Sequence, residues 1–409
     1  MIDEIIKSRP YIRRKIYSDR INPYIGKQII KVLSGQRRVG KSYILFQLID
    51  DIRKKDSEAN IIYISKELKA FDSIKTEDDL YNYIQKSLIK GKSNYVFVDE
   101  IQEIENFELA FRSLLAENTC DLFCTGSNAK LLSGELATTL AGRYIEFIIH
   151  SLGYDEFLHF MKLEPNNDAL NNYLNLGGMP YIKHIGLDEV TVFEYLRNVY
   201  ASILLKDVVA RENIRNVSFL ESLIEFLADN IGSLFSANNI SKYLKSQRAT
   251  VTPQAVLNYL KPLVNAYFIH KVPRYDINGL KIFETGEKYY FEDIGLRNAI
   301  RGFDRRKDIQ KVMENIVFLH LNRQGFNVFV GQYGVYEIDF VAKRKGKKVY
   351  VQVSYLLINN STIEREFGNL LKIVDNYPKY VVTMDEYNAG SDYKGITQLH
   401  LGDFLLLDL

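Results

Sequence analysis

The sequence predicts an α/β fold in which a parallel sheet carries helices on both faces. Short apolar runs alternate with amphipathic stretches over the first 150 residues. A glycine-rich run separates the first apolar run from the first strongly amphipathic stretch, and two acidic residues end the third apolar run. Alternating strands and helices indicate crossover connections, which cover both faces of a parallel sheet.

The elements of this first part follow from the spacing of apolar residues. Residues 42–54 have the period of a helix, because Ile44, Leu45, Leu48 and Ile49 fall on one face. Residues 1–28 are expected to be helical and polar. The expected strands are short apolar runs bounded by polar or turn-forming residues. They cover 29–33, 61–64, 95–98, 121–125 and 144–148.

Composition sets limits on the class of protein. A chain of 409 residues should contain about two to four domains. The formal net charge of +2 excludes a general nucleic-acid coat, so any DNA contact must come from a local patch. Two cysteines exclude a disulfide framework and suit a reducing compartment. No apolar run reaches the ~18 residues of a membrane span, and no signal peptide is evident, so a cytoplasmic protein is expected.

The glycine-rich run predicts a phosphate site. Residues 35–42 match G-x-x-x-x-G-K-[ST]. Gly35 and Gly40 allow backbone N–H groups to approach phosphate oxygens, and the following helix directs its positive end at them. Lys41 would reach the β- and γ-phosphates, and the Ser42 hydroxyl would bind Mg²⁺. The residues expected to contact ATP are Gly35, Gln36, Arg37, Arg38, Val39, Gly40, Lys41, Ser42 and Tyr43.

Two acids complete this predicted site. Asp99 and Glu100 end the apolar run 95–98, and the carboxyl ends of parallel strands meet at one edge of the sheet, beside the phosphate loop. Asp99 would hold Mg²⁺ through water. Glu100 would orient and deprotonate the attacking water, which a hydrolase requires and a small-molecule kinase does not. A helix cap is the alternative role for this acidic pair.

Further polar residues are candidates for contact with the γ-phosphate. Ser127 and Asn128 follow the fourth predicted strand and could bind the γ-phosphate or the water, or could simply cap a turn. Arg143 precedes the fifth predicted strand and could neutralise charge on the γ-phosphate, from its own subunit or a neighbour. A solvated or structural arginine is the other interpretation of Arg143.

Several runs have a more specific character than the phosphate motif alone. They are Ser34–Ser42, Val98–Gln102, Thr125–Ser127, Leu140–Arg143, Gly177–Pro180 and Leu205–Val208. Together they resemble a group of archaeal and bacterial AAA+-type ATPases with a C-terminal domain of unknown function. The resemblance implies a first sensor at Ser127 or Asn128 and an arginine finger at Arg143. The implied domains are an AAA+ core over 1–150, a helical lid over 151–212, a winged helix over 213–300 and a restriction-endonuclease-like domain over 301–409.

The third predicted domain, over 213–300, is expected to contain two helices and a hairpin. A helix over 236–246 precedes another that begins at Thr252-Pro253, and strands over 267–272 and 280–283 would be joined by a turn at 276–279. Two helices and a hairpin suit a winged helix. Its DNA-facing residues would be Gln254, Asn258, Lys261 and Asn265, preceded by Lys242, Lys245 and Arg248. Packing without DNA contact is the alternative.

The last predicted domain carries a degenerate nuclease pattern. Glu314 on a helix and Asp339 on a strand match the acids of a restriction-type nuclease, which hold Mg²⁺. However, Gln352-Val353-Ser354 replaces Glu-x-Lys, so we expect the fold without efficient cleavage. The turn Lys343–Lys348 carries five cations, which could grip DNA phosphates or could be an ordinary solvated turn.

Four functions are compatible with the sequence. The leading one is an ATP-hydrolysing AAA+ motor or switch that acts on DNA or a protein partner, or is gated by it, as a monomer or homo-oligomer. A small-molecule kinase is disfavoured because Glu100 suits water activation. The third function is an ATP-responsive DNA-binding regulator without essential hydrolysis, and the fourth is a weak Mg²⁺-dependent nuclease.

Overall fold

The chain folds into two compact units in the computed structural model. Unit 1 comprises Met1–His150 with Asn265–Tyr267, and unit 2 comprises Ser151–Val264 with Phe268–Leu409. The structure describes residues 6, 11–129, 140, 142–246, 252–283, 286–357, 360–386 and 389–409. Among these described residues, none of the helices combines the length and the apolar character that crossing a membrane requires.

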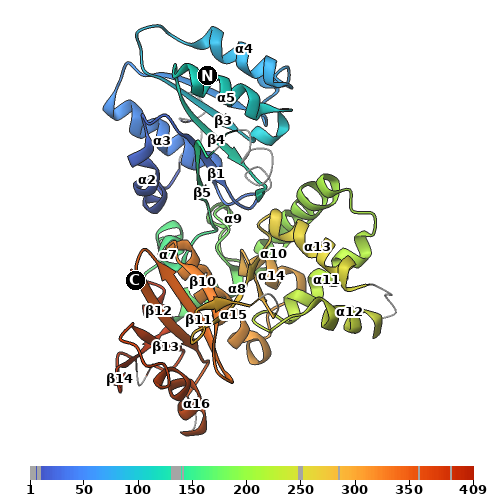
Figure 1. Ribbon diagram of the computed structural model, residues 1–409, viewed down its shortest axis with the longest axis vertical. Helices are drawn as coiled ribbons and strands as arrows, with labels where there is room; N and C mark the ends of the chain where they lie inside the picture. Colours follow the sequence, from blue (N-terminus) through green and yellow to red (C-terminus); the bar gives the residue numbers. More distant parts are fainter. Residues whose placement is uncertain are drawn as a thin grey trace. The chain divides into compact units, whose positions relative to one another are not determined.

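Unit 1 is built on a five-stranded parallel sheet in the order β2-β3-β4-β1-β5 (Figure 1). Each predicted strand is present, and its ends differ from the prediction by at most one residue. The glycine-rich run connects β1 to a helix, so the unit has the P-loop NTPase fold. The strands are β1 (Ile30–Ser34), β2 (Asn60–Ser65), β3 (Asn94–Asp99), β4 (Asp121–Gly126) and β5 (Tyr144–Ile148).

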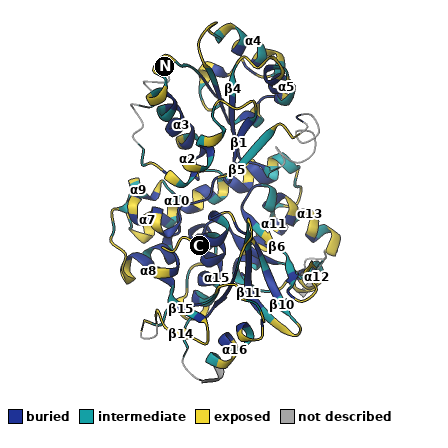
Figure 2. Cartoon of the chain, turned by 60° about the vertical axis from the view of Figure 1, so that its left-hand side comes forward, coloured by how far each residue is buried: buried dark blue, intermediate teal, exposed yellow. Residues whose placement is uncertain are grey.

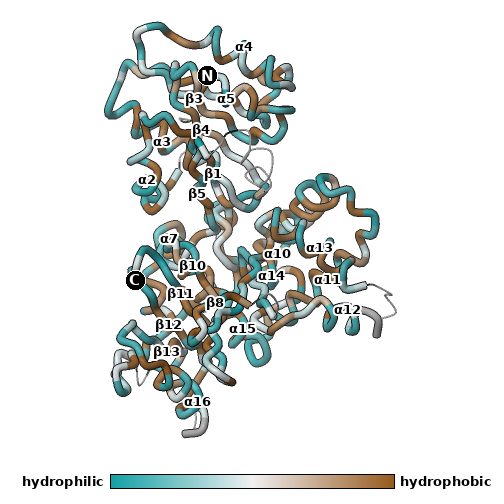
Figure 3. The backbone as a smooth tube through the Cα atoms, in the orientation of Figure 1, coloured by the Kyte–Doolittle hydropathy of each residue, from teal (hydrophilic) through white to brown (hydrophobic). Residues whose placement is uncertain are grey.

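Helices cover both faces of this sheet, as predicted. Alternate residues of each strand point to opposite faces, so Val32 joins the core beneath α4 and α5 while Leu33 joins the core beneath α2 and α3. Figure 3 shows these strands as an apolar centre. The helices are α2 (Lys15–Ile21), α3 (Lys41–Lys55), α4 (Glu77–Ser87) and α5 (Phe107–Glu117), with short 3₁₀ turns at Asn22–Tyr24, Lys69–Phe71 and Ile101–Glu103.

Unit 2 begins with helices, in agreement with the pattern after residue 150. They are α7 (Tyr154–Met161), α8 (Asn167–Leu176), α9 (Ile182–Ile185), α10 (Glu189–Ser202), a π-helix (Ile203–Ala210), α11 (Val217–Asp229), α12 (Ala237–Ser246) and α13 (Pro253–Asn265). The N-terminus of α13 is as predicted, because the Thr252 hydroxyl accepts a hydrogen bond from Ala255 N at 3.2 Å. Tyr243 of α12 is 44% exposed.

Unit 2 also contains an eight-stranded mixed sheet, in the order β14-β15-β13-β12-β11-β10-β7-β8 (Figure 2). Its strands are β7 (Arg274–Asp276), β8 (Lys281–Ile282), β10 (Asn327–Tyr333), β11 (Tyr336–Arg344), β12 (Lys347–Val353), β13 (Lys379–Thr383), β14 (Asp392–Tyr393) and β15 (Ile396–His400). The accompanying helices are α14 (Ile294–Arg301), α15 (Arg305–Arg323), α16 (Asn360–Leu371) and α17 (Leu401–Phe404).

The predicted wing hairpin is wrong in its pairing. β6 (Ile269–Val272) does not pair with 280–283; its partner is β9 (Lys288–Phe291), in an antiparallel ribbon. The turn at 276–279 does join two antiparallel strands, β7 and β8. However, β7 also pairs in parallel with β10, so this hairpin extends the large sheet across the predicted boundary at residue 300. The four-domain division therefore stays a prediction.

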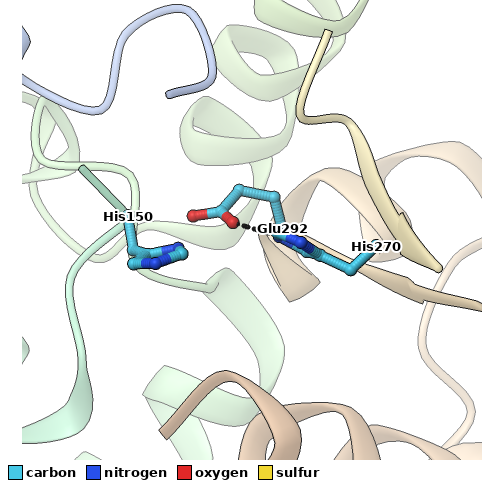
Figure 4. A group of neighbouring side chains, drawn as sticks. All are labelled: His150, His270 and Glu292. Carbon is cyan, nitrogen blue, oxygen red and sulfur yellow. Dashed lines mark hydrogen bonds and ion pairs between the residues drawn. The ribbon is translucent and has the colours of Figure 1, made fainter. Parts of the chain in front are cut away.

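The β6–β9 ribbon carries a buried acid–imidazole pair. Glu292 directly follows β9, and one of its carboxylate oxygens contacts His270 Nε2 (Figure 4). The other oxygen accepts a hydrogen bond from Ser151 N at 2.9 Å. Both carboxylate oxygens thus have partners, as a nearly inaccessible acid requires.

Candidate active site

The phosphate loop of unit 1 depends on glycine at two positions. Gly35 (φ 138°) and Gly40 (φ 97°) adopt conformations that favour glycine. A Cβ at Gly35 would lie 2.2 Å from the carbonyl oxygen of Ile149. The first glycine is therefore needed to pack the loop against the end of β5, a constraint that the sequence did not reveal.

The loop surrounds the ammonium group of Lys41. Lys41 Nζ donates to the carbonyl oxygens of Gly35 and Gln36, each at 2.9 Å, and the side chain is buried. Gln36 is also buried, and within the described part of the chain neither atom of its amide has a hydrogen-bond partner. A buried amide without partners costs free energy, so Gln36 is suited to a polar ligand.

The structure brings Ser42 and Asp99 together. Asp99 ends β3 and is 2% exposed, and its carboxylate accepts hydrogen bonds from Thr125 Oγ1 at 2.6 Å and from Tyr63 OH at 3.2 Å. Burial raises the pKa of Asp99 to about 6, and hydrogen bonds from the Thr125 and Ser42 hydroxyls oppose that rise. The acid from β3 and the end of the phosphate loop therefore share one edge of the sheet, as predicted.

The backbone of Glu100 has an unusual conformation. Its φ of 56° is left-handed, which costs about 1 kcal/mol in a residue other than glycine. Glu100 N donates to Thr125 Oγ1 at 2.9 Å, so one hydroxyl ties both acids in place. Sequence reasoning missed Thr125 as a site residue. The available signal was its position at the carboxyl end of β4, the strand that pairs with β3.

Three other predicted residues lie at this edge. Ser127 and Asn128 are buried and follow β4, whose Gly126 is in register with Ser34 at the start of the phosphate loop. Tyr43 is 39% exposed and packs its ring edge-on against another ring of α3. Their positions suit the predicted contacts, and their roles remain predictions.

Arg143 lies at the opposite edge of the sheet. β5 runs parallel to β1, with Tyr144 opposite Ile30 and Ile148 opposite Ser34. Arg143 is exposed and precedes β5, so about 13 Å of strand separates it from the loop of its own chain, at ~3.3 Å per residue. This separation disfavours contact between Arg143 and its own phosphate site, and the role of Arg143 stays a prediction.

A buried arginine that the sequence did not single out supports the loop. Arg14 is 3% exposed, and its Nη1 donates to the carbonyl oxygens of Val39 at 3.0 Å and His150 at 2.9 Å. Gln47 of α3 accepts a hydrogen bond from Arg14 N at 3.0 Å. Arg14 thus connects the phosphate loop to the last residue of the segment that closes unit 1.

The predicted DNA-facing residues of α12 and α13 differ in exposure. Gln254, Asn258 and Lys261 are exposed on α13, whereas Asn265 is half-buried. Lys242 is exposed on α12. The side chain of Lys245 and all of Arg248 lie outside the described residues.

The basic turn is smaller than predicted, because β11 continues to Arg344 and β12 starts at Lys347. Lys343 lies 3.4 Å from the ring centre of Tyr275, and Arg344 Nη1 and Nη2 donate to backbone carbonyl oxygens. Lys348 Nζ pairs with Asp375 at 3.0 Å. Much of this charge is therefore engaged within unit 2, and DNA contact by this turn stays a prediction.

Two family descriptions match the chain. An AAA domain matches residues 27–158, and a domain of unknown function matches residues 167–307. Two solved structures are distantly similar to this chain. Aeropyrum pernix ORC1 in complex with DNA has a TM-score of 0.34 at 10% identity, covering 71% of this chain and 92% of that one. Pyrobaculum aerophilum Cdc6p has a TM-score of 0.30 at 12% identity, covering 74% and 93%. These scores are too low to support a conclusion about function.

Full-length relatives are closer. An uncharacterized protein of Haemophilus influenzae is 34% identical over 405 residues, which is 98% of this chain and 100% of that protein. The uncharacterized protein MJ1544 of Methanocaldococcus jannaschii is 31% identical over 377 residues, covering 87% of this chain and 82% of that protein. The chain therefore belongs to the same family as these two proteins, and its residues 27–158 form an AAA domain.

Proposed function

We propose that unit 1 binds ATP with Mg²⁺ and hydrolyses its γ-phosphate bond. The main support is that Asp99, at the end of β3, and the loop that follows β1 lie at the same edge of the parallel sheet, where the Ser42 hydroxyl lowers the pKa of the Asp99 carboxylate and so joins the two halves of the predicted site. A hydroxyl and a carboxylate are hard oxygen ligands of the kind that Mg²⁺ prefers. When bound, the ion would neutralise charge on the β- and γ-phosphates.

The protein's own groups have distinct tasks in this proposal. Backbone N–H groups of Gly35–Ser42 bind the phosphates, and Lys41 contributes the fixed positive charge. Glu100 accepts a proton from the water that attacks the γ-phosphorus atom, and the bond to the bridging oxygen of ADP breaks. Thr125 positions both acids by its two hydrogen bonds. Ser127 or Asn128 contacts the γ-phosphate.

Phosphate release without any added acceptor tests the reaction. Wild-type protein should release phosphate from ATP, and Glu100→Gln should retain nucleotide binding while losing turnover. Glu105→Gln is a matched control, because Glu105 is an exposed acid in the same loop region. Absence of nucleotide binding in a folded sample, measured by calorimetry, would end the proposal. Turnover that requires a small-molecule acceptor would favour a kinase.

We further propose that Arg143 acts on the site of a neighbouring copy, which makes the active protein a homo-oligomer. Its exposed position at the amino edge of the sheet supports this arrangement. Arg143→Ala and Lys41→Ala should each be inactive, and a mixture of the two should regain part of the activity, because some interfaces then combine an intact loop with an intact arginine. A mixture that stays inactive while the subunits co-assemble would refute this role.

DNA is the partner proposed for unit 2. Gln254, Asn258 and Lys261 form an exposed polar face on α13, and such side chains suit contact with bases and phosphates. Duplex DNA should raise the rate of phosphate release, and Lys261→Ala should weaken DNA binding. If Glu100→Gln binds DNA in an ATP-dependent manner and retains full function, a regulator without essential hydrolysis would be favoured.

A further inference from the structure

Three residues that a metal-dependent nuclease would use converge in unit 2. Glu314 comes from α15, Asp339 from β11 and Gln352 from β12. Asp339 and Gln352 lie side by side on paired strands, and Asp339 N donates to Gln352 Oε1 at 3.2 Å. All three residues are at least nine-tenths buried. The structure therefore brings the predicted metal ligands together, and the negative charge of their carboxylates requires a nearby cation.

A lysine from another element lies among these acids. Lys288 belongs to β9 and is 2% exposed. Its Nζ lies 3.0 Å from Glu314 Oε1 and 2.9 Å from Glu337 Oε1. Asp339 Oδ1 is 4.0 Å from the same nitrogen. A single ammonium group thus contacts carboxylates from α15 and β11, where a divalent cation would be expected.

The remaining ligand atoms are mostly engaged. Tyr290 OH donates to Glu314 Oε1, and Val353 N donates to Asp339 Oδ2 at 2.8 Å. The carbonyl oxygen of Gln352, its only atom able to bind a metal, accepts the Asp339 N–H. Mg²⁺ demands near-octahedral oxygen coordination at ~2.0–2.1 Å. These residues, as arranged, do not fit such an ion.

Glu314 is also covered from the helical part of unit 2. A Cβ at Gly232 would lie 2.8 Å from both carboxylate oxygens of Glu314. The positive φ of 72° at Gly232 further favours glycine. The chain after α11 therefore packs directly against this acid.

We propose that Lys288 is a built-in cation that replaces the divalent ion of this centre, so that the domain is a metal-independent module and not a nuclease. The absence of lysine from Gln352-Val353-Ser354 agrees with this assignment. The lysine of a nuclease serves to align water beside a bound metal. Lys288 instead occupies the space between the acids and ties α15, β9 and β11 together.

The proposal predicts that removal of Lys288 creates a cation site. Lys288→Ala removes the charge and leaves room for an ion among the carboxylates. Glu366 of α16 offers a further ligand, because its Oε2 is buried and has no hydrogen-bond partner within the described residues. Its charge also acts on Asp339, whose pKa is raised by burial and by the Glu314 and Glu366 carboxylates.

Electron paramagnetic resonance of free Mn²⁺, with the full chain and no nucleotide, tests this directly. Wild type and Asp339→Asn should bind the same amount of Mn²⁺. Lys288→Ala should bind about one more ion per chain, and Lys288→Ala with Asp339→Asn should lose it. The nucleotide site of unit 1 is intact in all four proteins, so its background cancels and the result does not depend on the proposed ATP hydrolysis.

Two results would overturn the proposal. One is Mn²⁺ binding by wild type that Asp339→Asn abolishes, or Mn²⁺-dependent plasmid cleavage with the same dependence on Asp339. The other is a folded Lys288→Ala protein that gains no Mn²⁺. If Lys288→Ala does not fold, the comparison between wild type and Asp339→Asn still decides whether the native centre holds a metal.

Discussion

Both units contain a buried lysine, Lys41 in unit 1 and Lys288 in unit 2. Lys41 of unit 1 donates to neutral backbone carbonyl oxygens, and hydroxyl groups hold Asp99 in place. Lys288 of unit 2 is paired with the carboxylates of Glu314 and Glu337. A carbonyl shell leaves the charge of a lysine available to a phosphate, whereas a carboxylate shell neutralises it. The presence of a lysine does not by itself indicate that a site can bind a phosphate. The groups that contact the lysine give that indication.

The largest effect expected from this comparison is on the stability of unit 2. Lys288→Met leaves buried carboxylates without a counter-charge and should lower the free energy of unfolding by about 3–5 kcal/mol. Denaturant unfolding measures this. Lys271→Met, which breaks the pair between the exposed Lys271 and the partly buried Glu287, should cost at most ~1 kcal/mol. Equal losses for the two variants would show that Lys288 has no special role.

Lys41→Met should have the opposite profile. Loss of the fixed charge at the phosphates should lower the rate of phosphate release by about 10²–10³-fold. Stability should change less than in Lys288→Met, because the ammonium group of Lys41 donates to the neutral backbone carbonyl oxygens of Gly35 and Gln36. Lys54→Met, at an exposed position on the same helix, is the control. A large loss of stability with retained turnover would remove the contrast between the two lysines.

A substitution at Thr125 tests whether a hydroxyl group holds the buried carboxylate of Asp99 in place, as the ammonium group of Lys288 holds that of Glu314. Thr125→Val removes two hydrogen bonds at once, and an unsatisfied buried acceptor costs about 1–3 kcal/mol. We expect turnover to fall by roughly tenfold, at ~1.4 kcal/mol per factor of ten, with nucleotide binding largely retained. Thr119→Val, on the exposed turn before β4, should leave both unchanged. Unaltered turnover in Thr125→Val would mean that the acids are positioned by other groups.

The two units also differ in how much of them the sequence could predict. In unit 1, each strand is a short apolar run, and parallel strands bring their carboxyl ends together, so Ser42 and Asp99 could be paired from sequence. The edge of Arg143 was predictable by the same rule, since it precedes a parallel strand. In unit 2, β7 pairs with β10 and Lys288 reaches Asp339 across long segments. The spacing of apolar residues along a short segment does not reveal contacts between distant segments. The strand pairing at the predicted wing and the position of Lys288 among the acids therefore could not be predicted.

A substitution at Arg14 should have the smallest and most selective effect. Arg14 is a buried cation that donates to backbone carbonyl oxygens, as Lys41 does, but it lies outside the phosphate loop. Arg14→Lys keeps the charge but cannot span the carbonyl oxygens of Val39 and His150 with the same geometry. Loss of one such hydrogen bond should cost about 1.5–3 kcal/mol at most. If Arg14 positions the loop, nucleotide affinity should fall several-fold more than the melting temperature alone would explain, while turnover at saturating ATP stays close to wild type. If Arg14 is only structural, the melting temperature should fall and the affinity should not. A lower melting temperature with unchanged affinity would leave Lys41 as the one of these two cations that acts in the active site.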